Sequence, residues 1–469
     1  MRIAAAIFCV ITILVTGCQS QYKTPDLGGL YNALVQNENP YRNPVILIPG
    51  FLGSRLIERD SKGVAWGAFG NKGTNPNTEK GSRRIALPME MGKTLRDLRD
   101  NNIPAGALDK VVVNFLGYPL EQNTYSYILQ VLGVGGYRDQ DMGESGRIEY
   151  GDRHYTCFQF DYDWRRDIVE SARDLNGFIK EKKKYVQGEI EKRFGIKDVD
   201  VKFDIVAHSM GGLLSRYFLR YGTAELPDDG SLPEITWAGA RHVENLVMIG
   251  TPNSGSLDAL VNLVNGFRPA LFLPHYSSAL LGTMPAIYEL LPRSRHKPVR
   301  DNKGNSVDIL SPELWRKNKW GLANPAQDKV LKMLLPKITD PAVRRKIALE
   351  HQEKCLIRAN QFFTAIDIPA KPPASLKTLL VAGDSEKTIK GANVDSKGHL
   401  KITAYGPGDG TVLRSSALGD DRGDENKSAR LISPIHWNQV LFLFSDHLGL
   451  TKNPMFTDNL LYFLLENPQ

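Results

Sequence analysis

Short apolar runs separated by turn residues and by longer helical patterns recur along most of the chain. A buried parallel strand gives a continuous run of this kind, because both faces of its sheet are covered. Strands that alternate with helices in this way predict an α/β fold, with a mostly parallel central sheet and helices on both faces. The runs that we interpret as strands are residues 44–48, 155–160, 199–207, 243–249, 376–382 and 400–405.

Two helical patterns complete this picture. Residues 166–194 show the spacing of a long amphipathic helix, and Gly195 supplies a stop signal after it. Residues 440–444 form a short apolar run near the end of the chain, which we interpret as a helix.

The stretch around Ser209 carries the clearest chemical signal. An apolar run, residues 203–207, leads into the sequence HSMGG, and a helical pattern follows directly. Strand, sharp turn and helix with a serine at the turn match the nucleophile elbow of α/β-hydrolases, G-x-S-x-G, except that Ala207 replaces the first glycine. Small neighbours allow the strand and the helix to approach closely. A helix N-cap is the alternative role for Ser209.

A second loop belongs with this elbow. The run over residues 44–48 ends at Pro49-Gly50, which breaks the strand. In α/β-hydrolases the corresponding loop supplies one backbone N–H to the oxyanion hole, and the residue after the nucleophile supplies the other. The sequence therefore predicts the N–H groups of Phe51 and Met210 as the oxyanion donors.

Three segments together resemble the lecithin:cholesterol acyltransferase family, which includes lysosomal phospholipase A2-type acyltransferases. Residues 44–56, PVILIPGFLGSRL, look like the family's opening segment. Residues 158–165, FQFDYDWR, resemble its PYDWR segment, and residues 249–256, IGTPNSGS, match its strand after the nucleophile helix. The resemblance implies an α/β-hydrolase with a cap and a small lid that acts on lipid esters.

The other two triad residues follow from this resemblance and from the order of the fold. The family's acid lies in a GDGTV turn, which identifies Asp409 here, with Asp384 as the alternative. Triad order in this fold is serine, acid, histidine. His436 comes after the last predicted strand and before the apolar run, so it is the predicted base. His447 is the rival, placed inside or at the end of the final predicted helix.

The resemblance also points to lid and substrate residues. A lid over about residues 56–119 would contain Trp66, either as a membrane-touching tryptophan or as an ordinary core residue. Human members close this lid with a disulfide, and no cysteine is present here to form one. Asp163 and Trp164 follow a strand end, where α/β proteins place ligand loops. For Asp163 and Arg165 we favour a structural role, in which they pair with each other or cap the next helix.

The first residues predict export and lipidation. A basic residue precedes an apolar run over residues 3–15, and a Thr-Gly pair precedes Cys18, as in a bacterial lipobox. We expect residues 1–17 to be a signal peptide, and residues 18–40 to be a lipidated tether to the bacterial cell envelope, at the outer membrane in a Gram-negative host. An ordinary signal peptide is the alternative.

Length and charge fit one large α/β domain with insertions, or two domains. The chain has 469 residues and a net charge of +7, without lysine runs interleaved with aromatic residues. A nucleic-acid partner is therefore not indicated, and an anionic membrane surface suits the charge better. The cysteines lack metal-ligand spacing, so a metal site is not indicated, and acyl transfer from a serine needs no cofactor. The predicted layout is a hydrolase core over residues 41–251 and 374–469, with a cap insertion at 252–373.

These features predict a serine-dependent lipid acyl hydrolase or O-acyltransferase. Ser209 would attack an ester carbonyl, His436 would take the serine proton and Asp409 would orient the imidazole, which gives an acyl-enzyme. Water or a lipid alcohol would then accept the acyl group, and the resemblance implies a phospholipid as donor. Two alternatives stay open: a carboxylesterase of non-membrane esters, and a catalytically inactive lipoprotein that binds lipid.

Overall fold

The computed structural model describes residues 25–36, 38–68, 73–108, 110–115, 118–123, 125–268, 274–422 and 430–466. The predicted signal peptide and Cys18 lie outside the described residues.

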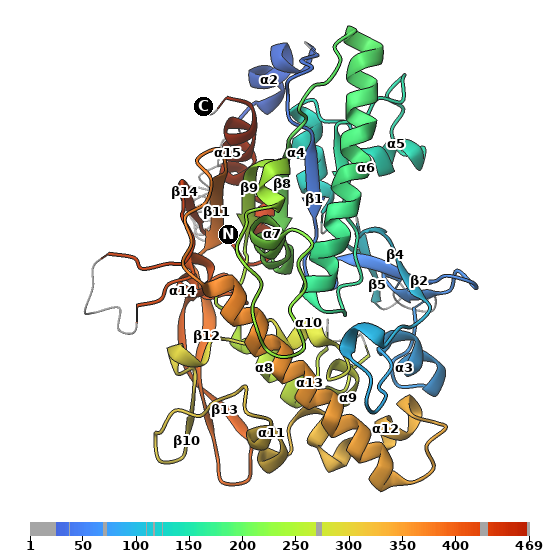
Figure 1. Cartoon of the computed structure of the whole chain (residues 1–469), viewed down its shortest axis with the longest axis vertical. Coiled ribbons are helices and arrows are strands. Elements are labelled where there is room, and N and C mark those ends of the chain that lie inside the picture. Colours follow the sequence, from blue (N-terminus) through green and yellow to red (C-terminus); the bar gives the residue numbers. More distant parts are fainter. Residues whose placement is uncertain are drawn as a thin grey trace, which may run out of the picture.

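Six strands, parallel throughout, form the central sheet (Figure 1). Their order across the sheet is β14-β11-β9-β8-β1-β7. The predicted strands supply five of the six, and the sixth, β14, lies where a helix was predicted. The strand bounds are β1 (Val45–Ile48), β7 (Cys157–Gln159), β8 (Phe203–His208), β9 (Val243–Ile249), β11 (Lys377–Gly383) and β14 (Gln439–Leu443).

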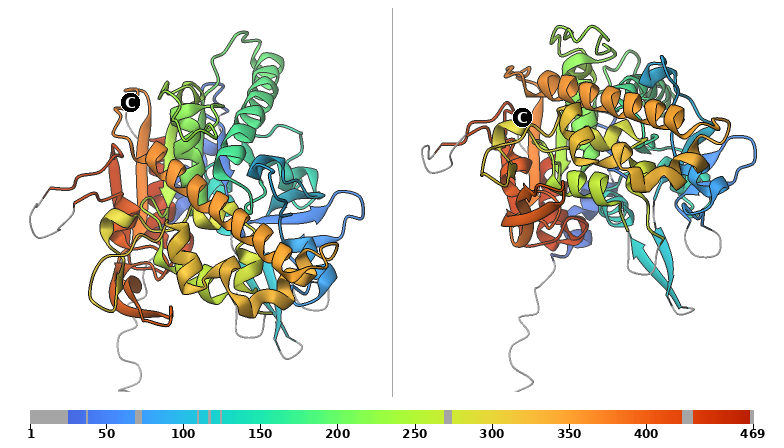
Figure 2. Two further views of the ribbon diagram at one scale, coloured as in Figure 1. Left: turned by 60° about the horizontal axis from the view of Figure 1, so that its bottom comes forward. Right: turned by 90° about the horizontal axis from the view of Figure 1, so that it is seen from below.

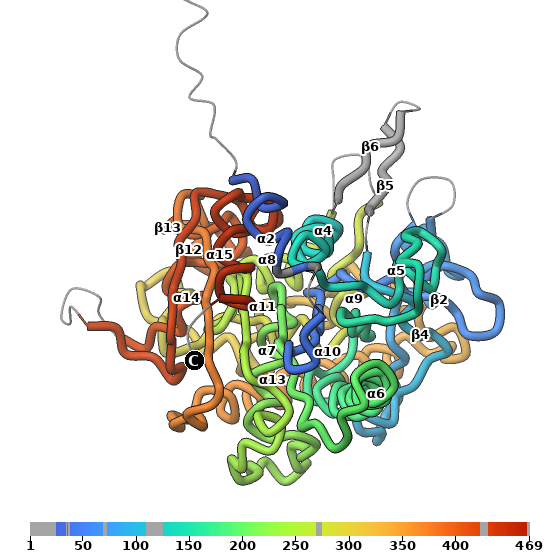
Figure 3. Tube along the Cα trace, turned by 90° about the horizontal axis from the view of Figure 1, so that it is seen from above, coloured from blue at the N-terminus to red at the C-terminus, as the bar shows by residue number. Residues whose placement is uncertain are grey.

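Helices cover both faces of this sheet, which explains why its strands read as continuous apolar runs. Along β1, Ile46 and Ile48 face one core, and Val45 and Leu47 face the other. Figure 3 shows α4 and α15 on one side of the sheet and α6 and α13 on the opposite side. The helices are α2 (Leu27–Gln36), α3 (Glu79–Ile85), α4 (Ser126–Val134), α5 (Gln140–Glu144), α6 (Ile168–Phe194), α7 (Met210–Tyr221), α8 (Leu257–Asn265), α9 (Ser278–Leu281), α10 (Pro285–Tyr288), α11 (Pro312–Asn318), α12 (Asp328–Leu334), α13 (Pro341–Asp367), α14 (Arg414–Leu418) and α15 (Pro454–Leu465).

The long helix α6 follows the sequence prediction closely. The Asp167 side chain accepts a hydrogen bond from the Val169 N–H and so caps the first turn. Gly195 ends the helix in the left-handed conformation, with φ of 69°. Among the described helices, neither this one nor any other combines the length and the apolar character needed to cross a membrane.

Smaller sheets lie outside the central one. β12 (Glu386–Val394) and β13 (Leu400–Gly408) form an antiparallel hairpin that β10 (Val299–Asp301) extends. The predicted strand at residues 400–405 therefore exists but belongs to this hairpin. A second sheet, in the region predicted as the lid, has the order β3-β2-β4, and β5 pairs with β6. Their bounds are β2 (Ser54–Glu58), β3 (Val64–Trp66), β4 (Asn102–Ala107), β5 (Lys110–Phe115) and β6 (Tyr118–Asn123).

The elements between β9 and β11 gather at one edge of the central sheet. In Figure 1 the helices α8, α9, α11 and α12 lie below the sheet, and Figure 2 shows α13 crossing this region. The arrowhead of β1 points toward them, so this is the edge at which the parallel strands end. Ligands of open α/β sheets bind at this edge, which makes it the place to look for a site.

Candidate active site

The turn between β8 and α7 has the geometry of a nucleophile elbow. Ser209 adopts φ of 52° and ψ of −123°, a conformation that non-glycine residues rarely hold without a functional reason. Ser209 is the N-cap residue of α7 by position, but its side chain makes no capping hydrogen bond to the helix, so its hydroxyl is not used as a cap. A Cβ added to Gly211 would lie 2.7 Å from the carbonyl oxygens of Ile48 and Pro49. Only glycine therefore fits where this turn meets β1.

His447 joins Ser209 to Asp409. The Nε2 atom of His447 lies 3.1 Å from the Ser209 Oγ, and its Nδ1 lies 2.7 Å from the Asp409 Oδ2. With the proton on Nδ1 donated to the carboxylate, Nε2 is free to accept the serine proton. These contacts are those that a serine nucleophile, its general base and an orienting acid require.

The prediction that His436 is the base is wrong, because the structure places it at the opposite edge of the sheet. The run near residue 440 is the strand β14 and not a helix, so His436 stands before the strand and His447 follows it. The Thr378 hydroxyl, at the amino end of β11, donates to the His436 carbonyl oxygen. The imidazole that reaches Ser209 belongs to the rival, His447.

Asp409 lies in the predicted turn after β13. The residue is 2% exposed, and its Oδ1 accepts hydrogen bonds from the N–H groups of Thr411 at 3.0 Å and Val412 at 2.7 Å. Burial alone would raise the pKa of Asp409, but the neighbouring His447 and these hydrogen bonds hold it below its ordinary value. The alternative acid, Asp384, instead lies 3.7 Å from the guanidinium of Arg414.

The surroundings of His447 favour its charged form. Burial disfavours the imidazolium, but the carboxylates of Asp409, Asp446 and Asp258 outweigh burial and raise the pKa of His447 above its ordinary value. Asp258 lies at the start of α8, so the predicted cap contributes a charge to the site. Burial and Asp409 in turn raise the pKa of Asp258 to about 6.

Aromatic side chains fix the loop after β1, which holds the predicted oxyanion donor Phe51. The Tyr162 hydroxyl donates to the Pro49 carbonyl oxygen at 2.9 Å, and the Gly50 N–H donates to the Tyr125 hydroxyl at 2.8 Å. A Cβ on Gly50 would lie 2.7 Å from the Cβ of Ser209, so this loop passes directly beside the nucleophile. Met210, the other predicted donor, is the first residue of α7, at the positive end of the helix dipole.

The predicted lid and substrate residues serve to hold this loop. Trp66 is 5% exposed and donates from Nε1 to the Leu52 carbonyl oxygen at 2.8 Å, so it is a core residue here and not an exposed lid residue. Trp164 is 1% exposed and donates to the Ser54 carbonyl oxygen at 3.0 Å.

Asp163 makes the ion pair, one of the two structural contacts that we favoured from the sequence. Its Oδ2 lies 2.7 Å from the guanidinium of Arg165. That guanidinium is fully buried and also pairs with Asp100, 2.7 Å away in the region predicted as the lid. The Asp-Trp-Arg segment therefore joins that region to the core.

Sequence reasoning did not single out Tyr125 or His208, both of which lie beside the triad. The Tyr125 hydroxyl oxygen is 3.2 Å from the Nδ1 of His208. His208 stands next to Ser209 in the motif, which is the one signal in the sequence that could have drawn attention to it. Tyr125 lies outside every motif that we recognised.

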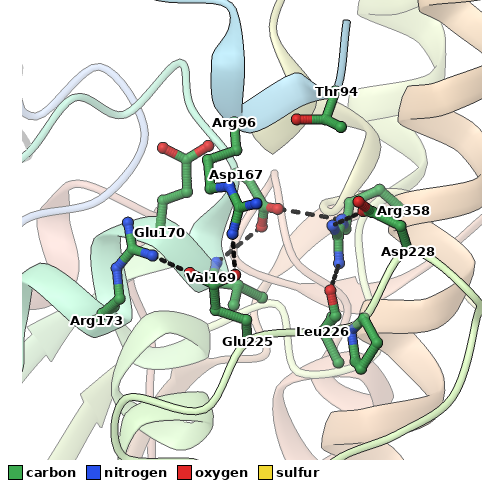
Figure 4. Close-up of a pocket in the computed structure, with 11 residues that line it drawn as sticks. Thr94, Arg96, Asp167, Val169, Glu170, Arg173, Glu225, Leu226, Asp228 and Arg358 are labelled. Atoms are coloured by element: carbon green, nitrogen blue, oxygen red, sulfur yellow. Dashed lines mark hydrogen bonds and ion pairs between the residues drawn. The ribbon is translucent and has the colours of Figure 1, made fainter.

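A separate polar cavity of about 220 Å³ lies away from the triad (Figure 4). Glu225 pairs with Arg96 and Arg173, and Arg358 lies 3.2 Å from Asp167. These four side chains and Asp167 are thus in ion pairs, and none of Ser209, His447 and Asp409 lines the cavity. We interpret the cavity as a place where the predicted lid packs against α6 and α13 through polar side chains.

Within the described part of the chain, no cluster of His, Cys, Asp or Glu side chains could hold a metal ion.

The parallel sheet, the elbow and the three joined side chains define an α/β-hydrolase. Within this class, residues 147–365 match the family model described as lecithin:cholesterol acyltransferase, which confirms the resemblance predicted from the sequence. The family match and the fold together support an enzyme that acts on acyl esters.

One solved structure shows the same fold at low sequence identity, and a second aligns more loosely. A chain in the crystal structure of the Tle4–Tli4 complex aligns with a TM-score of 0.51 and 15% identity, covering 90% of this chain and 97% of that chain. The lipase BlEst2 of Bacillus licheniformis in its mature form aligns with a TM-score of 0.31 and 12% identity, covering 92% of this chain and 95% of that chain. No curated protein matches the chain in sequence.

Proposed function

We propose that this protein is a serine-dependent lipid acyl hydrolase or O-acyltransferase that forms an acyl-enzyme on Ser209. The observation that carries the proposal is the hydrogen-bonded series Ser209–His447–Asp409 at the carboxyl edge of the sheet. A serine in a strained elbow, a base within hydrogen-bond reach and a buried carboxylate behind that base are the parts that nucleophilic acyl transfer needs.

The first half of the reaction makes the acyl-enzyme. Neutral His447 takes the hydroxyl proton as the Ser209 Oγ attacks the ester carbonyl, and Asp409 stabilises the imidazolium that forms. The N–H groups of Phe51 and Met210 would bind the oxyanion, each lowering the barrier by about 3 kcal/mol. His447 then gives its proton to the leaving alcohol.

The second half of the reaction decides whether the enzyme acts as a hydrolase or as a transferase. His447 deprotonates either water or an acceptor alcohol, which attacks the acyl-enzyme and releases a fatty acid or a new ester. We propose a phospholipid as the acyl donor. The matched family supports this, since its name couples a lecithin with an acyl transfer.

We also keep the proposal that the protein is a lipoprotein of the bacterial envelope. A lipid on Cys18 would hold the enzyme at the surface where its substrate lies. Replacing Cys18 with serine should move the protein from the membrane fraction to the soluble fraction. Equal membrane retention of both forms would argue against the anchor.

Product analysis with phosphatidylcholine vesicles tests the function, with and without a long-chain alcohol or a sterol. We expect free fatty acid from the wild type, a new ester when an acceptor is present, and neither from Ser209→Ala. Equal rates on short water-soluble esters and on vesicles would favour a carboxylesterase. If folded wild-type protein forms no product and binds no fluorophosphonate probe, the catalytically inactive alternative is correct.

A further inference from the structure

The Tyr125 hydroxyl is buried beside the elbow, where every polar group needs a partner. Tyr125 is 2% exposed and stands immediately before α4. Its oxygen accepts the Gly50 N–H at 2.8 Å and lies 3.2 Å from the His208 Nδ1. A Cβ added to Gly53 would lie 2.5 Å from this oxygen, so the loop after β1 closes tightly around it.

His208 continues the same series of contacts to the catalytic histidine. The Nε2 of His208 lies 3.3 Å from the carbonyl oxygen of His447, and the two ring centres are 5.0 Å apart. A carbonyl oxygen only accepts, so Nε2 carries the proton and Nδ1 is the acceptor. The hydroxyl of Tyr125 therefore donates to Nδ1, and its own oxygen accepts from Gly50. Each of the three donors, the Gly50 N–H, the Tyr125 hydroxyl and the His208 Nε2–H, then has an acceptor.

The charge state of His208 agrees with this assignment. Burial, with His447 close by, lowers the pKa of His208 to about 3. It therefore stays neutral throughout the range in which His447 titrates. A neutral ring can sit against the imidazolium that forms during catalysis without repelling it.

We propose that Tyr125 and His208 are a positioning pair that joins the oxyanion loop to the catalytic histidine. One end of the pair fixes the Gly50 peptide, one residue before the predicted donor Phe51. The other end fixes the main chain of His447. The oxyanion donor and the base are thereby held on either side of Ser209 before substrate binds, which is the preorganisation that lowers a charged transition state. The inference rests on the proposed function.

A purely structural role for the same hydrogen bonds is the competing explanation, and Tyr137 provides the matched control. It is also 2% exposed and lies in the same core, but within the described structure its hydroxyl has no hydrogen-bond partner. We compare Tyr125→Phe with Tyr137→Phe on phosphatidylcholine vesicles and in the rate of fluorophosphonate labelling of Ser209.

Tyr125→Phe should lower kcat about 10- to 100-fold with KM within about twofold, because the lost contacts matter in the transition state. The labelling rate should fall by a similar factor, and Tyr137→Phe should keep the wild-type values. If folded Tyr125→Phe matches Tyr137→Phe in kcat and in labelling, the positioning role is wrong.

A second variant covers the case in which Tyr125→Phe does not fold. In His208→Gln the amide can still donate to the His447 carbonyl oxygen but has no acceptor at the Nδ1 position, so kcat should again fall about 10-fold or more. A double variant should be no slower than the slower single variant, because the two residues act as one unit. Wild-type kcat in His208→Gln, or full additivity, would overturn the proposal. Failure of the proposed function would look different, since the wild type itself would then be neither active nor labelled.

Discussion

The two edges of the central sheet carry similar residues but serve different purposes. At the amino edge, the Thr378 hydroxyl donates to the main-chain carbonyl oxygen of His436, and this contact joins the start of β14 to the start of β11. At the carboxyl edge, the residues after β8, β13 and β14 bring a hydroxyl, a carboxylate and an imidazole together. His436 and His447 flank the same five-residue strand. Position relative to a parallel strand, and not residue type, therefore decides which histidine can be catalytic.

The largest expected effect separates these two histidines. His447→Ala removes the base and should lower kcat by about 10⁴-fold or more, as loss of a triad member does. His436→Ala should leave kcat within about twofold of the wild type, because its ring lies at the other edge. Steady-state rates on one ester substrate, with circular dichroism to confirm folding, check both. A low kcat in His436→Ala together with a wild-type kcat in His447→Ala would mean that His436, and not His447, is the base.

Replacement of the carboxylate of Asp409 should have the next largest effect on kcat. Asp409→Asn cannot accept the Nδ1 proton of His447 as a carboxylate does, and kcat should fall by about 10⁴-fold. Asp384→Asn is the matched control, since this carboxylate faces Arg414 and not the triad. Its kcat should stay near the wild-type value. Equal losses in the two variants would mean that Asp409 has no special role.

A smaller loss should come from crowding the loop after β1. The Cβ in Gly50→Ala would meet the Ser209 Cβ at 2.7 Å, so the loop must shift and the predicted oxyanion donor with it. We expect kcat to fall about 100-fold, the size of the loss when one oxyanion donor is removed. Gly133→Ala on α4 is the control, because its Cβ would meet nothing within 4 Å. Unchanged kcat in Gly50→Ala would show that the loop is not close to the reaction.

The pH dependence of activity tests the role of His447 and of the carboxylates around it at the carboxyl edge. His447 must be neutral to act, so activity should be lost as the pH falls through its pKa, which lies above the ordinary histidine value of 6.5. Asp258→Asn removes a carboxylate that raises this pKa, so the acid limb should move to lower pH. Activity at pH 8 should change less than about twofold. Asp395→Asn, at a distant turn, should leave the profile in place, and an acid limb that does not move in Asp258→Asn would contradict the assignment.

The smallest effect is expected from a change at Glu225, far from both edges of the central sheet. Glu225 pairs with Arg96 and Arg173, but its side chain is 42% exposed, and ion pairs this open contribute little. Glu225→Gln should lower the free energy of unfolding by less than about 1 kcal/mol and leave kcat unchanged. Urea unfolding and steady-state kinetics measure both quantities. A large loss of kcat would indicate that this polar contact controls the site.

Much of the fold could be predicted because its strands are buried on both faces. β9 matches its predicted run, β1 lies inside its run and β11 is shifted by one residue, whereas β8 begins four residues later than its run and ends one residue later. The elbow could be predicted too, since the small residues around Ser209 are required by contacts such as that of Gly211 with β1. These signals are local, and the physical constraint acts on the residues that carry them.

The histidine that contacts Ser209 could not be predicted correctly, because a five-residue apolar run fits a strand and a helix equally well. Only the pairing of β14 with β11 decides between them, and that pairing is not visible in the local sequence. The role of Trp66 depended in the same way on tertiary contacts, here with Leu52 and Trp164. Residues that act through distant partners, such as Tyr125, carry no local signal at all.

Intact-protein and peptide mass spectrometry of a fluorophosphonate adduct asks whether Ser209 is the nucleophile and whether His447 activates it. We expect the wild type and His436→Ala to form an adduct on the Ser209 peptide at similar rates, and His447→Ala to form it at least about 10³ times more slowly. Labelling of His447→Ala at the wild-type rate, or an adduct on any residue other than Ser209, would contradict this expectation.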